Sequence, residues 1–64
     1  MISIIAPVFN EQECLEEFNR RIIKTLNSTN EDFEIIYIDD GSRDKSLELI
    51  KNFSKTSNRV KYIS

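Results

Sequence analysis

The feature that most constrains this chain is an apolar run that ends in two adjacent acids. Residues Phe33 to Ile38 read Phe-Glu-Ile-Ile-Tyr-Ile, and Asp39, Asp40 and the only glycine, Gly41, follow directly. A run this apolar is typical of a buried strand, and placing two like charges at its end costs stability. Adjacent carboxylates repel each other unless a ligand, a cation or several hydrogen-bond donors meet them. We therefore expect a binding site where this strand ends.

Length and composition bound what the chain can be. With 64 residues it is at most one small domain, and chains of this size bury only about 60% of the surface that their unfolded form exposes. The hydrophobic fraction of 39% predicts a globular rather than a disordered chain. A net charge of −2 with both signs mixed argues against general affinity for nucleic acid. Without histidine, this stretch lacks His-based acid–base chemistry.

The cysteine content, the hydropathy and the two chain ends predict the cellular compartment of the protein and whether the chain is a fragment. The single cysteine, Cys14, excludes an internal disulfide and is compatible with a reducing compartment. No segment approaches the roughly 20 apolar residues of a transmembrane helix, and the N-terminus does not read as a secretory signal. We expect a cytoplasmic protein, or one held at the cytoplasmic face of a membrane by later segments. Met1 before a strand is typical of a native start, whereas Val60 to Ser64 read as a strand cut short, so we expect a fragment of a longer protein.

The apolar periodicity predicts five elements in the order β-α-β-α-β. The first strand covers residues 2–6 and is expected to end at Pro7, because proline lacks a backbone donor. Strand–helix–strand connections of this length are right-handed and make neighbouring strands parallel. The predicted fold class is therefore α/β, half of a doubly wound, Rossmann-like parallel sheet. All strand C-terminal ends then share one edge, so residues 7–11 should lie close to residues 39–42.

Polar residues are expected to start both helices. Asn10 is a good N-cap for the first helix, and Glu13 completes a capping-box-like pair with it. Ser42 is expected to cap the second helix, with Asp44 in its first turn beside the helix dipole. The third strand is expected to begin near Val60.

Two clusters of candidate residues should meet at the carboxyl edge of the sheet. In the first, Phe9 could stack on a flat base for about 1–3 kcal/mol, or it covers the core beneath the loop. Glu11 is a candidate ligand contact or a surface acid that suits the helix dipole. In the second, Asp40 could accept a hydrogen bond from the ring N–H of uracil or guanine, and Gly41 permits a positive φ. The alternative is that Asp39 is held by backbone donors and Asp40 is solvated, as in an ordinary turn.

The two clusters, in this order, resemble the N-terminus of family 2 glycosyltransferases of the GT-A fold. The residues that carry the resemblance are Pro7-Val8-Phe9-Asn10-Glu11 and Asp39-Asp40-Gly41-Ser42, with Glu34 to Ile38 before the acids and Arg43 to Leu47 after them. Within that family the chain resembles the dolichyl- or undecaprenyl-phosphate sugar transferases. The resemblance covers essentially all 64 residues but only the opening portion of such an enzyme. It implies that residues 1–64 are the N-terminal, nucleotide-binding portion of a GT-A domain.

The resemblance also implies roles for individual residues. Those that would bind the nucleotide-sugar are Pro7, Phe9, Glu11, Ile38 and Asp40. Phe9, where the family usually has tyrosine, would lie against the base. The backbone of Ile38 would contact the base, and Asp40 would contact its ring N–H. Asp39 would support the loop from behind, and Gly41 would let the loop approach the nucleoside.

Metal and base are implied to lie elsewhere in the full-length protein. The family binds Mg²⁺ or Mn²⁺ through an Asp-x-Asp motif after a later strand, and its catalytic base follows later still, beyond Ser64. Asp39 and Asp40 are adjacent, so we do not interpret them as that motif. The full-length enzyme would transfer a sugar, with inversion, from a UDP- or GDP-sugar to an unidentified acceptor, for which a polyprenyl phosphate is one candidate. This piece alone is expected to bind no metal and to be inactive.

Two other interpretations stay open. A phosphoacceptor receiver domain also uses paired acids at strand ends, but there the pair ends the first strand, whereas here it ends the second. The other is a truncated or degenerate transferase homologue kept for binding or assembly, since the discriminating residues would lie beyond Ser64. Half a sheet also leaves an apolar edge and face uncovered, so self-association of the fragment is a further expectation.

Overall fold

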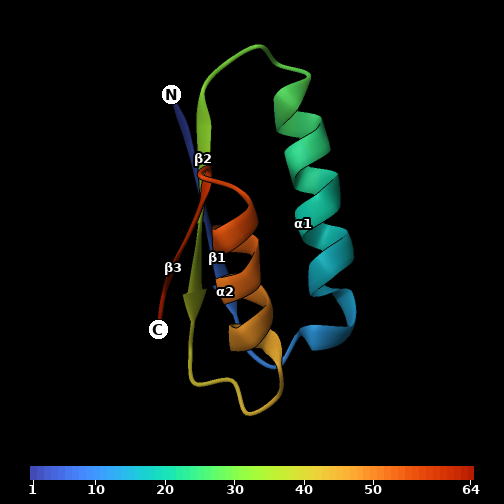
Figure 1. The fold of residues 1–64 in the computed structure, drawn as a ribbon, viewed down its shortest axis with the longest axis vertical. Helices are drawn as coiled ribbons and strands as arrows, with labels where there is room; N and C mark the ends of the chain where they lie inside the picture. Colours follow the sequence, from blue (N-terminus) through green and yellow to red (C-terminus); the bar gives the residue numbers. More distant parts are fainter.

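The computed structural model describes residues 1–64 as a three-stranded parallel sheet with two helices (Figure 1). The elements are, in chain order, β1 (Ile2–Val8), α1 (Gln12–Asn27), β2 (Phe33–Asp39), α2 (Ser46–Thr56) and β3 (Val60–Ile63). The strand order is β1-β2-β3, so β2 is the central strand. The predicted fold class is confirmed: the chain is the β-α-β-α-β half of a doubly wound, Rossmann-like sheet.

The register of the strands decides where the loops lie. β1 and β2 end opposite each other, because Val8 pairs with Asp39. In the central strand, Ile38 pairs with Pro7 of β1 on one side and with Ile63 of β3 on the other. The loops that follow β1 and β2 therefore leave the sheet at the same edge, and Figure 1 shows them side by side at one end of the molecule.

The structure corrects the predicted end of the first strand. Pro7 does not terminate β1, which continues to Val8. β1 pairs only with β2 and is an edge strand. An edge strand tolerates proline because only one of its sides is hydrogen-bonded to a neighbour, so the missing N–H need not interrupt the ladder.

The predicted start of α1 is also wrong. The helix begins at Gln12, and its N-cap position is Glu11, which makes no side-chain capping hydrogen bond. Asn10 lies outside the helix with a φ of 51°, in the left-handed region that asparagine tolerates better than most residues. The capping box of Asn10 with Glu13 is therefore not formed, because the Asn10 side chain binds the other loop instead.

The predicted start of α2 fails for the same reason. The helix begins at Ser46, with Lys45 at its N-cap position and no side-chain capping hydrogen bond from Lys45. Ser42 lies four positions earlier, where its hydroxyl accepts a hydrogen bond from the first loop. Asp44 precedes the helix instead of lying in its first turn.

The core lies between the sheet and the two helices, which cover the same face (Figure 1). The buried hydrophobic residues are Val8, Leu15, Leu26, Phe33, Ile35, Tyr37, Ile50 and Val60. Tyr37 is the largest of the fully buried side chains. Its ring centroid lies 6.4 Å from that of Phe18 and 6.0 Å from that of Phe53. Its hydroxyl donates a 2.6 Å hydrogen bond to Asn19 Oδ1, so one strand residue ties both helices to β2.

The opposite face of the sheet carries no helix. Its isoleucines are Ile5, Ile36, Ile38 and Ile63, of which the first and last are each 57% exposed. A polar row crosses the same face: Ser3 Oγ donates to Glu34 Oε2 at 2.7 Å, and Lys61 Nζ lies 2.8 Å from Glu34 Oε1. The hydrogen bonds from Lys61 and then from Ser3 hold the pKa of Glu34 below its ordinary value.

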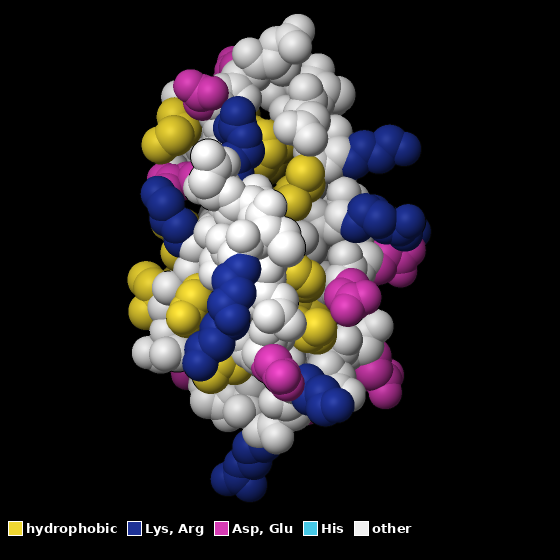
Figure 2. Space-filling model, viewed as in Figure 1, with side chains coloured by type: hydrophobic (Ala, Val, Ile, Leu, Met, Phe, Trp, Pro, Cys, Tyr) yellow, Lys and Arg dark blue, Asp and Glu magenta, His cyan; other side chains and the backbone are white.

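Charged side chains are dispersed over the surface. In Figure 2, acidic and basic side chains are interspersed, with hydrophobic side chains in small groups between them. Cys14 is a free and exposed thiol. Neither helix combines the length and the apolarity that crossing a membrane requires.

Tyr37 gives the fold a predictable response to alkali. Burial raises the pKa of Tyr37 from 10.0 to about 12. The folded state therefore keeps a proton that the unfolded state loses, so this contribution to stability is complete below about pH 10 and is lost as the pH rises through about 12. We expect the free energy of unfolding, measured by urea titration, to fall across that pH range.

The two tyrosines offer a matched pair for this experiment. Tyr37→Phe should lower the free energy of unfolding at neutral pH by about 1 kcal/mol through loss of one hydrogen bond, and should flatten the alkaline fall. Tyr62→Phe alters the other tyrosine, which is 39% exposed, and should keep the wild-type profile. An alkaline fall of wild-type size in Tyr37→Phe would contradict the assignment.

Candidate functional site

Two loops form the carboxyl edge of the sheet: the first loop (residues 9–11) after β1 and the second loop (residues 40–45) after β2. One backbone hydrogen bond joins the start of the second loop to the end of β1, from Asp40 N–H to Val8 O at 2.9 Å. In the remaining hydrogen bonds between these two regions, side chains on each side accept from backbone amides on the other side.

Asn10 makes a reciprocal pair with the second loop. Its backbone N–H donates to Ser42 Oγ at 3.0 Å, and its side-chain Oδ1 accepts from the N–H of Arg43 at 2.7 Å. Each loop therefore supplies one side chain and one amide to the other. A side chain that would normally satisfy its own helix end is here used between loops.

Gln12, the first residue of α1, makes a second reciprocal pair. Its backbone N–H donates to Asp44 Oδ2 at 3.2 Å, and its side-chain Oε1 accepts from the N–H of Lys45 at 2.8 Å. A helix leaves its first amides without intrahelical partners. At the start of α1 one of these amides is satisfied by a carboxylate from the second loop.

Ser46 completes the connection from the start of α2. Its hydroxyl oxygen accepts from the N–H of Glu11 at 2.8 Å, and its own N–H donates to Asp44 Oδ1 at 2.9 Å. Ser46 is the buried polar residue of the chain, with a relative exposure of 0%. We call the side chains that connect the two loops the loop clasp: Asn10, Gln12, Ser42, Asp44 and Ser46.

Four of the predicted binding residues surround one shallow hollow beside the clasp. A hollow of about 200 Å³ is lined by Pro7, Val8, Phe9, Glu11 and Asp40. Phe9 is 55% exposed, so much of its surface is open to solvent. The hollow thus combines an exposed aromatic ring with two carboxylates, one from each loop.

Ile38, the fifth predicted binding residue, does not line the hollow. It lies in the central strand, paired with Pro7 and Ile63, and its side chain is on the helix-free face. A contact between its backbone and a base stays a prediction.

The two predicted supporting residues shape the start of the second loop. Asp39 Oδ2 accepts a hydrogen bond from the N–H of Ser42 at 3.3 Å, while its Oδ1 is buried without a partner. Gly41 has a φ of 78°, and nothing lies within 4 Å of the position that a Cβ would occupy. Glycine is therefore favoured here by its backbone conformation and not by lack of space.

The acids of this edge do not fit the divalent metal that the family resemblance implies. No group of three or more Cys, Asp or Glu side chains gathers anywhere in the chain. One carboxylate oxygen of Asp39 already accepts a hydrogen bond from Ser42. Asp40 is the only acid of the second loop that lines the hollow. Mg²⁺ and Mn²⁺ favour a near-octahedral set of oxygen ligands, which these residues do not provide.

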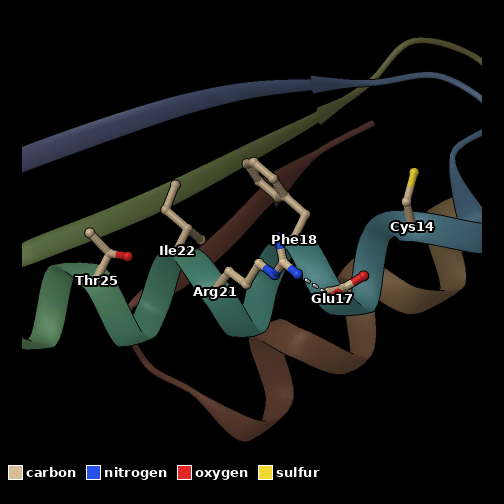
Figure 3. Close-up of a pocket in the computed structure, with 6 residues that line it drawn as sticks. All are labelled: Cys14, Glu17, Phe18, Arg21, Ile22 and Thr25. Atoms are coloured by element: carbon tan, nitrogen blue, oxygen red, sulfur yellow. Dashed lines mark ion pairs between the residues drawn. The ribbon is translucent and has the colours of Figure 1, made fainter.

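A larger hollow of about 410 Å³ lies along α1 and is a weaker candidate (Figure 3). All of its lining residues come from that helix, and Figure 3 shows Phe18 and Ile22 pointing toward the strands. Its charged groups neutralise each other, because Arg21 lies 2.8 Å from Glu17. The smaller hollow is the better candidate because groups from two strand ends converge on it.

The clasp contains residues that reasoning from the sequence did not single out. Gln12 and Ser46 received no role, and Asn10, Ser42 and Asp44 were interpreted as local helix-start residues. The sequence shows only that residues 10–12 and residues 42–46 all have hydrogen-bonding side chains. Which of them bind each other is decided by the parallel pairing of β1 with β2, which places the two loops side by side.

Comparison with known proteins gives one family. The model of the family described as "Glycosyl transferase family 2" matches residues 3–64. An uncharacterized glycosyltransferase of Haemophilus influenzae is 48% identical over 61 residues, covering 95% of this chain and 23% of that protein. The uncharacterized glycosyltransferase YkcC of Bacillus subtilis is 36% identical over 61 residues, covering 95% and 19%. The undecaprenyl-phosphate 4-deoxy-4-formamido-L-arabinose transferase of Edwardsiella ictaluri is 40% identical over 50 residues, covering 78% and 15%. The chain spans about a fifth of the length of these relatives.

The Asp44 carboxylate gives the paired loops a predictable response to acid. The hydroxyl of Ser46, with the amides of Ser46 and Gln12, holds the pKa of Asp44 below its ordinary value of 3.8. Its contribution to stability is therefore complete above that ordinary value and is lost as the pH falls through the lower pKa of the folded state. Asp44→Asn should lower the free energy of unfolding at neutral pH and flatten its fall on acidification below about pH 4.

Urea titrations between about pH 5 and pH 2 measure both effects. An NMR titration of the Asp44 carboxyl carbon in the wild type provides the direct check, with a midpoint expected below 3.8. A midpoint at or above that value, or acid profiles that run parallel in wild type and variant, would contradict the prediction.

Proposed function

This chain belongs to glycosyl transferase family 2, and on that basis we propose that it forms the nucleotide-sugar-binding portion of a glycosyltransferase. The donor is a UDP- or GDP-sugar, bound at the carboxyl edge of the sheet. The observation that carries the proposal is the hollow at that edge, where Pro7, Phe9, Glu11 and Asp40 come together from two strand ends. Open α/β sheets bind their ligands in this position, outside the carboxyl ends of the strands.

The chemistry of the hollow fits a nucleoside whose base carries a ring N–H. The ring of Phe9 is exposed and offers a stacking surface. The carboxylate of Asp40 accepts a charge-assisted hydrogen bond from the ring N–H of uracil or guanine. Adenine has no equivalent ring donor, so the same pair of groups disfavours an adenine nucleotide. The backbone of Asp40 is held in place by its hydrogen bond to Val8.

The reaction we propose for the full-length protein is a displacement at the anomeric carbon. An acceptor oxygen forms a bond to that carbon, the bond from the carbon to the nucleoside diphosphate oxygen breaks, and the diphosphate leaves with the electron pair. A hydroxyl acceptor would give its proton to a base, whereas an ionised phosphate acceptor has none to give. We assign neither that base nor the metal site to residues 1–64. The name of the Edwardsiella relative, which includes undecaprenyl phosphate, supports a polyprenyl phosphate as the acceptor.

Asp40→Ala tests the base contact. Loss of a hydrogen bond to a charged group costs about 1.5–3 kcal/mol, so the dissociation constant for UDP or GDP should rise about 10- to 100-fold. Isothermal titration calorimetry with UDP, GDP and ADP measures the effect, and ADP should bind weakly to wild type and variant alike.

Asp32→Ala is the charge-matched control. Asp32 directly precedes β2, at the opposite end of the strand from Asp40, and its side chain is 84% exposed. The Asp32→Ala variant loses one negative charge, as Asp40→Ala does, and should bind UDP and GDP with unchanged affinity. Equal affinity of Asp40→Ala and wild type for UDP and for GDP would overturn the site assignment.

A further inference from the structure

We propose that the loop clasp positions the two walls of the nucleotide hollow, so that Asn10, Gln12, Ser42, Asp44 and Ser46 are positioning residues for nucleotide binding. The inference rests on the proposed function, because it concerns the geometry of that same hollow. None of these side chains needs to touch the nucleotide. They act by fixing Phe9 and Glu11 of the first loop against Asp40 of the second.

The walls of the hollow are each attached directly to the clasp. Phe9 is followed by Asn10, whose amide is bound to Ser42, two residues after Asp40. Glu11 is itself bound through its amide to the buried Ser46 hydroxyl at 2.8 Å. Each wall residue is therefore at most two residues along the chain from a hydrogen bond to the opposite side of the hollow.

The direction of the hydrogen bonds separates a clasp from ordinary helix caps. A cap joins a side chain to the first turn of its own helix and leaves neighbouring loops independent. Here Asn10 and Gln12 bind amides of the second loop. Ser42 and Ser46 bind amides of the first loop, and Asp44 binds the amide of Gln12 at the start of α1. Opening any one of these bonds removes one of the connections between the two loops, while both helices keep their internal hydrogen bonds.

Preorganisation links this geometry to affinity. When a ligand must order two loops on binding, the free-energy cost of that ordering lowers its affinity. A site that is already ordered avoids this cost. When only a fraction of molecules has both walls in place, the apparent dissociation constant rises in inverse proportion to that fraction. Removing a clasp bond should therefore weaken nucleotide binding without removing any ligand contact.

Ser42→Ala and Gln12→Ala test the proposal, because each removes one cross-loop acceptor. Each should raise the dissociation constant for UDP or GDP about 3- to 10-fold, as expected for one hydrogen bond. Ser42→Thr keeps the hydroxyl and should restore wild-type affinity, which loss of bulk or of general stability would not explain. In the free protein, exchange of the Asn10 amide should accelerate in Ser42→Ala, and exchange of the Lys45 amide in Gln12→Ala.

Thr29→Ala is the matched structural control, at the opposite end of the molecule. Its hydroxyl also binds the backbone, donating to Leu26 O at 2.7 Å and accepting from the N–H of Glu31. The Thr29→Ala variant should therefore have a lower free energy of unfolding and an unchanged nucleotide affinity.

The outcomes separate the two proposals. Wild-type binding that is kept unchanged in Ser42→Ala and Gln12→Ala would overturn the positioning role alone. Absence of UDP and GDP binding by the wild type would overturn the proposed function and the positioning role with it. Equal loss of affinity in Thr29→Ala and the clasp variants would assign the effect to global stability and likewise overturn the positioning role.

Discussion

The parallel pairing of β1 with β2 is the constraint on which the rest of the structure depends. Its register runs from Ile2 opposite Phe33 to Val8 opposite Asp39, so both strands end at one level. Two loops must then turn back toward the helices from adjacent points. Their backbone amides cannot all be satisfied within the helices that follow, and partners are available across the narrow gap between the loops. The clasp is a consequence of the pairing.

Much of the fold could be predicted because its signals are periodic. In β2, burial of Phe33, Ile35 and Tyr37 alternates with half-buried residues, and on α2 the apolar Ile50 is fully buried. Such patterns report which face an element buries, whatever its partner is. On α1, Phe18 is 43% exposed, and its ring packs edge-on against Tyr37.

The predictions of helix starts and of the first strand's end failed because contacts between distant parts of the chain decided these positions. Asn10 and Ser42 are good capping residues by type, but a cap rule considers only amides of the helix that follows. The amides that these side chains bind lie more than 30 residues away in sequence. For Pro7 the missing information was the position of β1 in the sheet, since proline ends a central strand but not an edge strand. The placement of the candidate site at the strand ends needed only the element order, whereas its internal hydrogen bonds needed the register.

The helix-free face helps to enforce that register from the other end of the sheet. Ser3 and Glu34 are direct register partners, and Lys61 reaches Glu34 from β3, so one polar row joins all three strands. A slip by one residue would turn these side chains toward the core, where an unpaired charge is costly. The observed register keeps the polar row on the helix-free face, pairs Ser3 directly with Glu34, and keeps the alternating apolar residues inside. Because the same register sets Val8 against Asp39, the alignment of the two loops at the carboxyl edge is protected by charges near the opposite edge.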